Sequence, residues 1–427
     1  MAKLKGGTDF QLIERIFNQL SSSVSIALLK DEKLAYEFYG GRKAASPAVA
    51  GGSRGRTAGA AGSGGGFGAV GGGIIRAGRG LIGLGIGKGS KSAEGSDDKG
   101  GGKGGGKGAG SAKDADGRYA GYNVAAGSGK NDGRQDEPAI NRTTRFNIGS
   151  ASAMFTGALI IKLMEFGEVG LNDAVVRFIP EFPFKDITVY HLLTHTSGLT
   201  SENIALPDNY TAMRDFYRKL YEKLGRAFKP GAKSEHYVYG YAILADIVGR
   251  ASSQMLEELA SVLIFMPLGM KYTTYNSAAL RDSQYVIPWN HKENRFMGEL
   301  HAKHPTGHSG LYTTALDLIR FGRLFLSGGE YDGKQVFLES SVDFLLREIT
   351  DSRFMRTPLF MIKRQVDIFG CFSEKLSPEA VALTGDTGSI LFIDPARRIV
   401  GAALTNSTWV HSVSRNYSNI VDILTSI

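Results

Sequence analysis

Ser150 has the setting of a nucleophile in this 427-residue chain. It follows Arg145-Phe146-Asn147-Ile148-Gly149 and precedes an apolar run at 158–164. This order predicts a short strand, a tight glycine turn and a buried helix. The free backbone N–H groups and the positive dipole end of a helix start favour developing negative charge. Ser150 is therefore a candidate nucleophile, and the alternative is an N-cap serine that stabilises the helix by about 1 kcal/mol.

Four histidines form the second group that could carry chemistry. His301, His304 and His308 follow one another at close spacing, and His236 could join them as a metal ligand. However, no Cys, Asp or Glu stands at supporting spacing, and a proline and a glycine within the cluster break any helix that would align the rings. We therefore expect a polar loop here, with no metal and no other cofactor.

The elements that must position these residues come from both ends of the chain. Residues 9–20 have apolar side chains at helical spacing, and 24–39 form two alternating runs around Asp31-Glu32, which predicts an antiparallel hairpin. Strand patterns return at about 366–406, with helical periodicity between, and 413–426 predict a C-terminal helix. Termini that share one sheet indicate a single cooperative unit.

A glycine-rich segment interrupts this pattern. Residues 51–113 hold 27 of the 57 glycines, and their ten basic and three acidic residues carry +7 of the net charge of +8. Such a composition cannot bury enough apolar surface to offset the entropy of ordering it. We interpret 45–135 as a disordered insertion. Its apolar, basic part at 74–88 is either a flexible tether or a weak contact with an anionic membrane or a protein.

The rest of the composition excludes several classes. Outside the insertion the chain is almost neutral, so no nucleic-acid groove is expected. The single cysteine, Cys371, excludes an internal disulfide framework. The N-terminus has no apolar leader, and no stretch of about 18 apolar residues exists. These features predict a cytoplasmic protein. Nothing in them indicates its oligomeric state.

Several short motifs occur in one order along 10–40 and 141–427. They are the Ser150 segment, Leu171-Asn172-Asp173, the run from Ile187 to Leu199, Pro230-Gly231, Pro267-Leu268-Gly269-Met270, Gly310-Leu311, and the closing stretch from Gly388 to Asn406. Together they resemble the family of class C β-lactamases, penicillin-binding proteins and related serine esterases. The resemblance implies an α+β, β-lactamase/transpeptidase-like fold, with an antiparallel sheet from both chain ends, flanking helices and a helical lobe. It divides the chain into 1–44, the insertion 45–135, and 136–427.

The resemblance also shows where this chain departs from its family. Ser150 occupies the serine of the family's Ser-x-x-Lys motif, but Ala153 stands where the lysine would accept its proton. Counting from Pro230-Gly231, the family's tyrosine falls on His236, and a loop one residue longer would instead place it on Tyr237. Because imidazole titrates near neutral pH, His236 is a reasonable general base for Ser150. The alternative is that His236 has drifted in an inactive site.

The family's closing His/Lys-Thr/Ser-Gly strand reads Leu383-Thr384-Gly385 here. Thr384 and Gly385 retain the strand that lines the pocket, whereas Leu383 removes a cation that would contact a substrate carboxylate. We therefore expect a pocket for a small ester, amide or peptide-like ligand, with neutral compounds preferred over β-lactams or peptidoglycan fragments.

Three functions are compatible with these changes. The chain could be a catalytically impaired family member that binds a ligand or a partner, which three altered motifs favour. It could be an active serine esterase or amidase that uses Ser150 with His236. It could also be a non-catalytic assembly protein that associates through its glycine-rich segment. A conserved fold does not choose between them.

Overall fold

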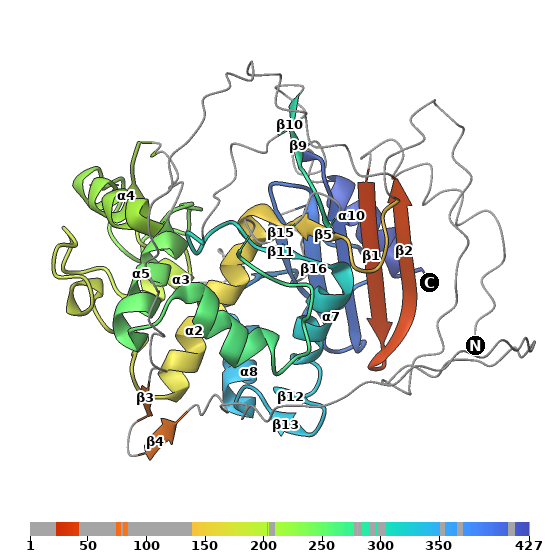
Figure 1. Cartoon of the computed structure of the whole chain (residues 1–427), viewed down its shortest axis with the longest axis horizontal. Helices are drawn as coiled ribbons and strands as arrows, with labels where there is room; N and C mark the ends of the chain where they lie inside the picture. The colour runs from red at the N-terminus through yellow and green to blue at the C-terminus, as the bar shows by residue number, and fades with distance from the viewer. Residues whose placement is uncertain are drawn as a thin grey trace, which may run out of the picture.

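Strands from both ends of the chain share one antiparallel sheet in the computed structural model (Figure 1). The structure describes residues 23–41, 139–202, 204, 210–276, 280, 284–290, 305–350, 355–364, 370–408 and 415–426, together with the backbone of 74–77, 80–83 and 295–296. The predicted helix at 9–20 lies outside these ranges. Inside the predicted insertion, β3 (Ile74–Ala77) and β4 (Gly80–Gly83) pair antiparallel. The disorder of the remaining 45–135 stays a prediction.

The central sheet has six strands in the order β14-β15-β16-β17-β1-β2. All its pairings are antiparallel. The strands are β1 (Ser23–Lys30), β2 (Lys33–Gly41), β14 (Met361–Ile362), β15 (Val381–Gly385), β16 (Ser389–Asp394) and β17 (Ile399–Thr405). β1 lies beside β17, with Val24 opposite Thr405 and Lys30 opposite Ile399. The predicted sheet from both chain ends is therefore confirmed.

The N-terminal hairpin turns at the two residues that the sequence indicated. Asp31 and Glu32 have φ angles of +49° and +61°. Two successive left-handed residues are what a two-residue type I′ turn requires, because its twist matches that of the strands.

Both faces of the sheet are covered. Ala27 and Leu29 of β1 pack into the larger core with the helical lobe, whereas Ile26 and Leu28 pack into a second cluster with Tyr417 of α10. Side chains alternate between the faces of a strand, so an apolar run that serves two cores has no polar side. The C-terminal helix α10 (Arg415–Leu424) confirms the one expected at 413–426.

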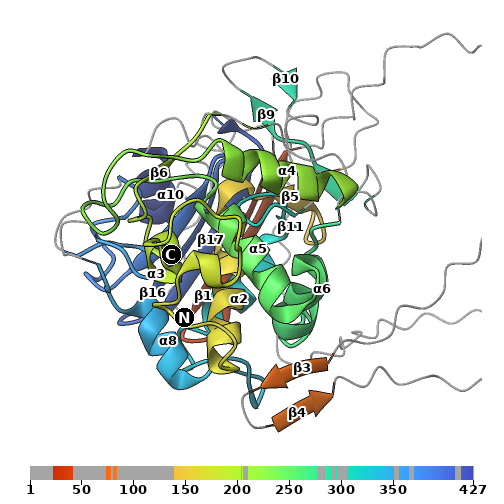
Figure 2. The ribbon, with the colours of Figure 1, turned by 90° about the vertical axis from the view of Figure 1, so that its left-hand side faces the viewer.

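The middle of the chain supplies the helical lobe, in which α2, α5 and α6 lie close together (Figure 2). Its helices are α2 (Ala153–Glu165), α3 (Val189–Leu193), α4 (Tyr210–Glu222), α5 (Gly240–Ser252), α6 (Leu256–Ala260) and α8 (Glu339–Leu346), with the 3-10 turns η1 (Gly149–Ser152) and η2 (Val175–Arg177) and the π-helical segment η3 (Ser261–Phe265). Helix α7 (Ala315–Arg323) packs against β1, β16 and β17 of the central sheet. A small sheet joins β11 (Tyr312–Thr313), β5 (Arg145–Asn147) and β8 (Tyr285–Val286). Short two-stranded ladders are formed by β6 (Leu199–Thr200) with β7 (Gly225–Arg226), β9 (Trp289–Asn290) with β10 (Arg295–Phe296), and β12 (Glu330–Tyr331) with β13 (Lys334–Gln335). No helix among the described residues has the length and apolarity to span a bilayer.

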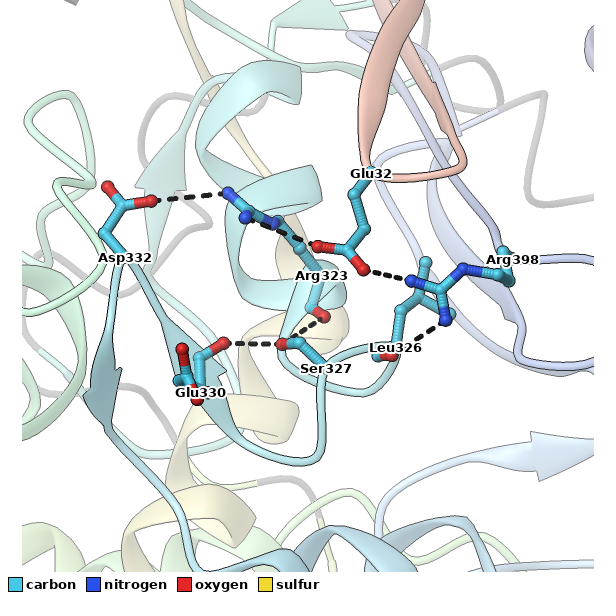
Figure 3. Close-up of polar contacts among 7 residues, drawn as sticks. All are labelled: Glu32, Arg323, Leu326, Ser327, Glu330, Asp332 and Arg398. Carbon is cyan, nitrogen blue, oxygen red and sulfur yellow. Dashed lines mark hydrogen bonds and ion pairs between the residues drawn. The ribbon is translucent and has the colours of Figure 1, made fainter.

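A cluster of charges ties the N-terminal hairpin to the rest of the sheet and to α7 (Figure 3). The Glu32 carboxylate accepts from Arg323 at 3.4 Å and from Arg398 in the β16–β17 turn. Arg323 lies 3.5 Å from Asp332. One carboxylate thus bridges two cations that come from distant parts of the sequence.

Replacing Glu32 tests this bridge. Glu32→Gln removes the charge, and we expect the free energy of unfolding to fall by about 1 kcal/mol, since a partly exposed network is worth little more. The loss should shrink in 1 M salt because of screening. Urea titration measures it. Glu330→Gln is the matched control, since Glu330 contributes its backbone carbonyl to the cluster. An equal loss in both variants would contradict the bridge.

Candidate functional site

Ser150 lies in η1, between β5 and α2, as the sequence predicted. Strand β5, the glycine turn and the buried helix follow in order. The N-cap interpretation of Ser150 is wrong, because Ile148 occupies the N-cap position of η1 and Ser152 that of α2, and neither side chain makes a capping hydrogen bond. A short 3-10 turn precedes the α-helix, so the N-cap position of α2 lies at Ser152, two residues after Ser150. Ser150 itself is half-buried.

The connection from β15 to β16, including the first residue of β16, holds this turn through three hydrogen bonds. Thr387 donates its hydroxyl to the Asn147 carbonyl at 2.8 Å, and Ser389 donates to the Ile148 carbonyl at 2.9 Å. The Ser150 N–H donates to the Asp386 carboxylate at 2.8 Å. We call residues 386–389 the β15 clamp. The clamp brings the strand of Thr384 and Gly385 directly against Ser150.

Gly385 permits this close approach. A Cβ at position 385 would lie 2.0 Å from the Ile148 carbonyl oxygen. Leu383, two residues earlier on the strand, is partly buried and packs against the core of the helical lobe. The strand of Leu383, Thr384 and Gly385 therefore meets the turn that carries Ser150, and its assignment to a ligand pocket stays a prediction.

Ala153 is the first residue of α2 and is half-buried against the same core. Its methyl group can neither accept a proton nor hold a charge. Lys162, farther along α2, pairs with Glu165 and donates to the Val336 carbonyl at 2.7 Å. These contacts hold the Lys162 ammonium group away from Ser150, so Lys162 does not replace the lysine that is absent at position 153.

His236 and Tyr237 are neighbours in the chain, but their side chains have different surroundings. The Tyr237 hydroxyl donates to Ser201 at 2.9 Å, and burial raises its pKa to about 12. His236 is exposed, and its ring lies 4.8 Å from that of buried His195. His236 is also close enough to His308 to affect the pKa of that ring. Tyr237 is thus engaged with Ser201, and the role of His236 as a general base stays a prediction.

His308, which the sequence analysis placed in a polar histidine loop, is buried within electrostatic reach of Asp386. The loop that carries it runs along the start of α2, since Thr156 donates to the Gly307 carbonyl at 2.7 Å and the Leu311 N–H donates to Ser152 at 3.1 Å. The ring is buried beside Tyr239. The sequence feature that could have placed His308 here is its position directly before Ser309-Gly310-Leu311. His301 and His304 lie outside the described residues, so the expected polar loop stays a prediction.

Burial also sets the charge of the histidines. It lowers the pKa of His308 to about 4, although the Thr306 carbonyl and the Asp386 carboxylate favour the protonated ring. Burial lowers the pKa of His195 well below its usual value, and Arg356 and His236 lower it further. Both rings are neutral at pH 7. Within the described ranges, no group of three His, Cys, Asp or Glu side chains is arranged to hold a metal ion.

Comparison with known proteins identifies the family of this chain. The family model described as Beta-lactamase matches residues 102–423. The chain belongs to the beta-lactamase family. A putative D-alanyl-D-alanine carboxypeptidase of Salmonella agona (strain SL483) is 23% identical over 303 residues, which cover 62% of this chain and 69% of the relative.

Solved structures show the same fold for this beta-lactamase-family chain. EstCE1, described as a hydrolase with promiscuous acyltransferase activity, matches with a TM-score of 0.62 at 12% identity, over 98% of this chain and 99% of its own. A class C beta-lactamase in complex with cefoxitin matches with a TM-score of 0.62 at 15% identity, over 98% of each chain. A penicillin-binding protein homolog from Caulobacter crescentus matches with a TM-score of 0.59 at 14% identity, over 98% of each chain. The β-lactamase/transpeptidase-like fold that the motifs implied is confirmed.

The close approach at Gly385 can be tested by adding one methyl group. Gly385→Ala should lower the free energy of unfolding by about 1–3 kcal/mol, because the new Cβ overlaps the Ile148 carbonyl and the strand must shift. Thermal and urea unfolding measure the change.

Gly249→Ala is the matched control for this variant. Its Cβ would lie 3.7 Å from the Gln254 carbonyl oxygen, an ordinary contact, and alanine is favoured in a helix. We expect no loss of stability there. A tolerated Gly385→Ala would mean that β15 does not press against the Ser150 turn.

The buried His308 predicts a pH dependence of stability. Its pKa is about 4 in the folded chain and 6.5 in the unfolded chain, so the unfolded state takes up the proton first as the pH falls. Stability is complete above pH 6.5 and declines between pH 6.5 and 4. His308 alone should cost about 2 kcal/mol at pH 5. Urea titrations from pH 7.5 to 5 should show a shallower decline for His308→Gln. An unchanged pH slope would count against a buried neutral ring.

Proposed function

We propose that this beta-lactamase-family chain keeps the serine pocket, hydrolyses very slowly, and acts by binding a small ester, amide or peptide-like ligand. The observation that carries the proposal is Ala153, half-buried at the first position of α2, one turn beyond Ser150. A serine hydroxyl is a weak nucleophile without a base to take its proton. Loss of that base lowers the rate by several orders of magnitude.

The charge of the pocket supports the same proposal. Leu383 offers an apolar surface where a cation would attract a substrate carboxylate, and His195 and His308 are neutral at pH 7. A ligand is therefore held by shape, apolar contact and neutral hydrogen bonds. The related putative D-alanyl-D-alanine carboxypeptidase and the structural neighbour EstCE1 are consistent with an acyl compound as the ligand class.

An active esterase or amidase is the second candidate. It is favoured by His236, whose exposed ring stands beside neutral His195 and within electrostatic reach of His308. In this case His236 would take the Ser150 proton as the hydroxyl attacks the carbonyl carbon, and it would return the proton to the leaving alcohol or amine. Tyr237 is held by Ser201 and would not take part.

Labelling and turnover separate the two candidates. The unaltered chain should react slowly with a fluorophosphonate probe and hydrolyse p-nitrophenyl acetate little above background. Ala153→Lys should raise the labelling rate by about 100-fold or more, because it supplies the missing base. Each measurement is paired with Ser150→Ala. Rapid turnover by the unaltered chain that disappears in both Ser150→Ala and His236→Ala would establish the esterase instead.

A further inference from the structure

The Asp386 carboxylate accepts a hydrogen bond from the backbone N–H of Ser150. Its Oδ1 atom accepts the Ser150 N–H at 2.8 Å, across 236 positions of the sequence. Asp386 is half-buried and directly follows Gly385 at the end of β15. An ionised carboxylate on a backbone N–H makes a charge-assisted hydrogen bond, which is about twice as strong as a neutral one. The Ser150 N–H is thus strongly held.

The turn is shaped around this carboxylate. Gly149 is buried with φ of +55°, a conformation that side chains rarely adopt. A Cβ at position 149 would lie 1.9 Å from the Asp386 Oδ1 atom. The carboxylate therefore fills the space that the missing side chain of Gly149 leaves. The neighbouring Gly149 N–H is taken by the Asn147 side chain at 2.8 Å.

This contact has a consequence for acyl chemistry at Ser150. When the Ser150 hydroxyl attacks an acyl carbon, negative charge develops on the acyl oxygen, and preorganised backbone N–H groups beside the nucleophile stabilise it. Here the nearest such donor already binds a full negative charge. An oxyanion would have to displace Asp386 or lie beside it, and like charges at that separation repel. Positions 153 and 383 hold Ala and Leu, so neither contributes a compensating cation.

We infer that Asp386 determines the specificity of this pocket: it serves as an internal anion on the Ser150 N–H and closes the site to oxyanionic groups. The inference rests on the proposed function in one respect, that ligands bind at Ser150. It narrows the ligand class to uncharged acyl compounds. It also supplies a cause of slow hydrolysis that is separate from the missing lysine at position 153.

Phenylboronic acid is the probe for this inference. The Ser150 oxygen donates an electron pair to boron, an O–B bond forms, the hydroxyl proton passes to solvent, and boron becomes a tetrahedral anion. Titration calorimetry and ¹¹B NMR compare the unaltered chain with Asp386→Asn and Asp386→Ala. Asp386→Ala should bind about 100-fold more tightly, the size of effect that one oxyanion donor has in other serine hydrolases. Asp386→Asn should bind with intermediate affinity.

Controls make each outcome decisive. Ser150→Ala in the Asp386→Ala background should abolish the gain, and Glu379→Gln, which removes an exposed carboxylate just before β15, should leave the affinity unchanged. Thermal unfolding verifies that each variant is folded. If Asp386→Ala does not fold, the comparison of the unaltered chain with Asp386→Asn tests the inference. Equal affinities, or no measurable binding by any of these chains, would overturn the inference. Rapid ester turnover by the unaltered chain would overturn both the proposed function and this inference, whereas slow turnover together with equal boronate affinities would overturn the inference alone.

Discussion

The contact between the β15 clamp and the turn that carries Ser150 is the constraint on which the site depends. Thr387 and Ser389 hold two consecutive carbonyls of that turn, and Asp386 holds the N–H of the serine. Gly385 lets the two backbones meet, because any side chain there would overlap the Ile148 carbonyl. The edge of the sheet and the start of α2 are thereby fixed relative to each other. The serine owes its position to residues more than 230 positions away.

The same contact determines the electrostatics around the serine. An acyl-transfer site needs a base beside the nucleophile and donors for an oxyanion. Here alanine stands at the position of the base, and the nearest donor faces a carboxylate. Burial keeps His195 and His308 neutral. The fold is that of the beta-lactamase family, but the Asp386 carboxylate beside the Ser150 N–H has the charge that would repel an oxyanion there.

The fold was predictable from local patterns, and the reasons are physical. Two alternating runs around Asp31-Glu32 allow little other than a hairpin, and both turn residues adopt the left-handed conformation. The apolar strands near the C-terminus must be buried on both faces, and the N-terminal hairpin supplies the neighbouring strand. The N-cap interpretation of Ser150 failed because a single 3-10 turn before α2 leaves no separate mark in the apolar pattern.

The sequence by itself determined the family, the shared sheet, the place of Ser150 and the absence of a lysine at position 153, because each depends on residue type and local order. Only the tertiary structure decided which side chains surround Ser150. His308 looked like a member of a histidine-rich loop, yet its loop packs along α2 and buries the ring near the site. Asp386 directly follows the Leu383-Thr384-Gly385 motif and belongs to no motif of its own, yet its carboxylate accepts the serine N–H. Such contacts join segments far apart in the chain, and their geometry arises when the sheet closes against the helical lobe.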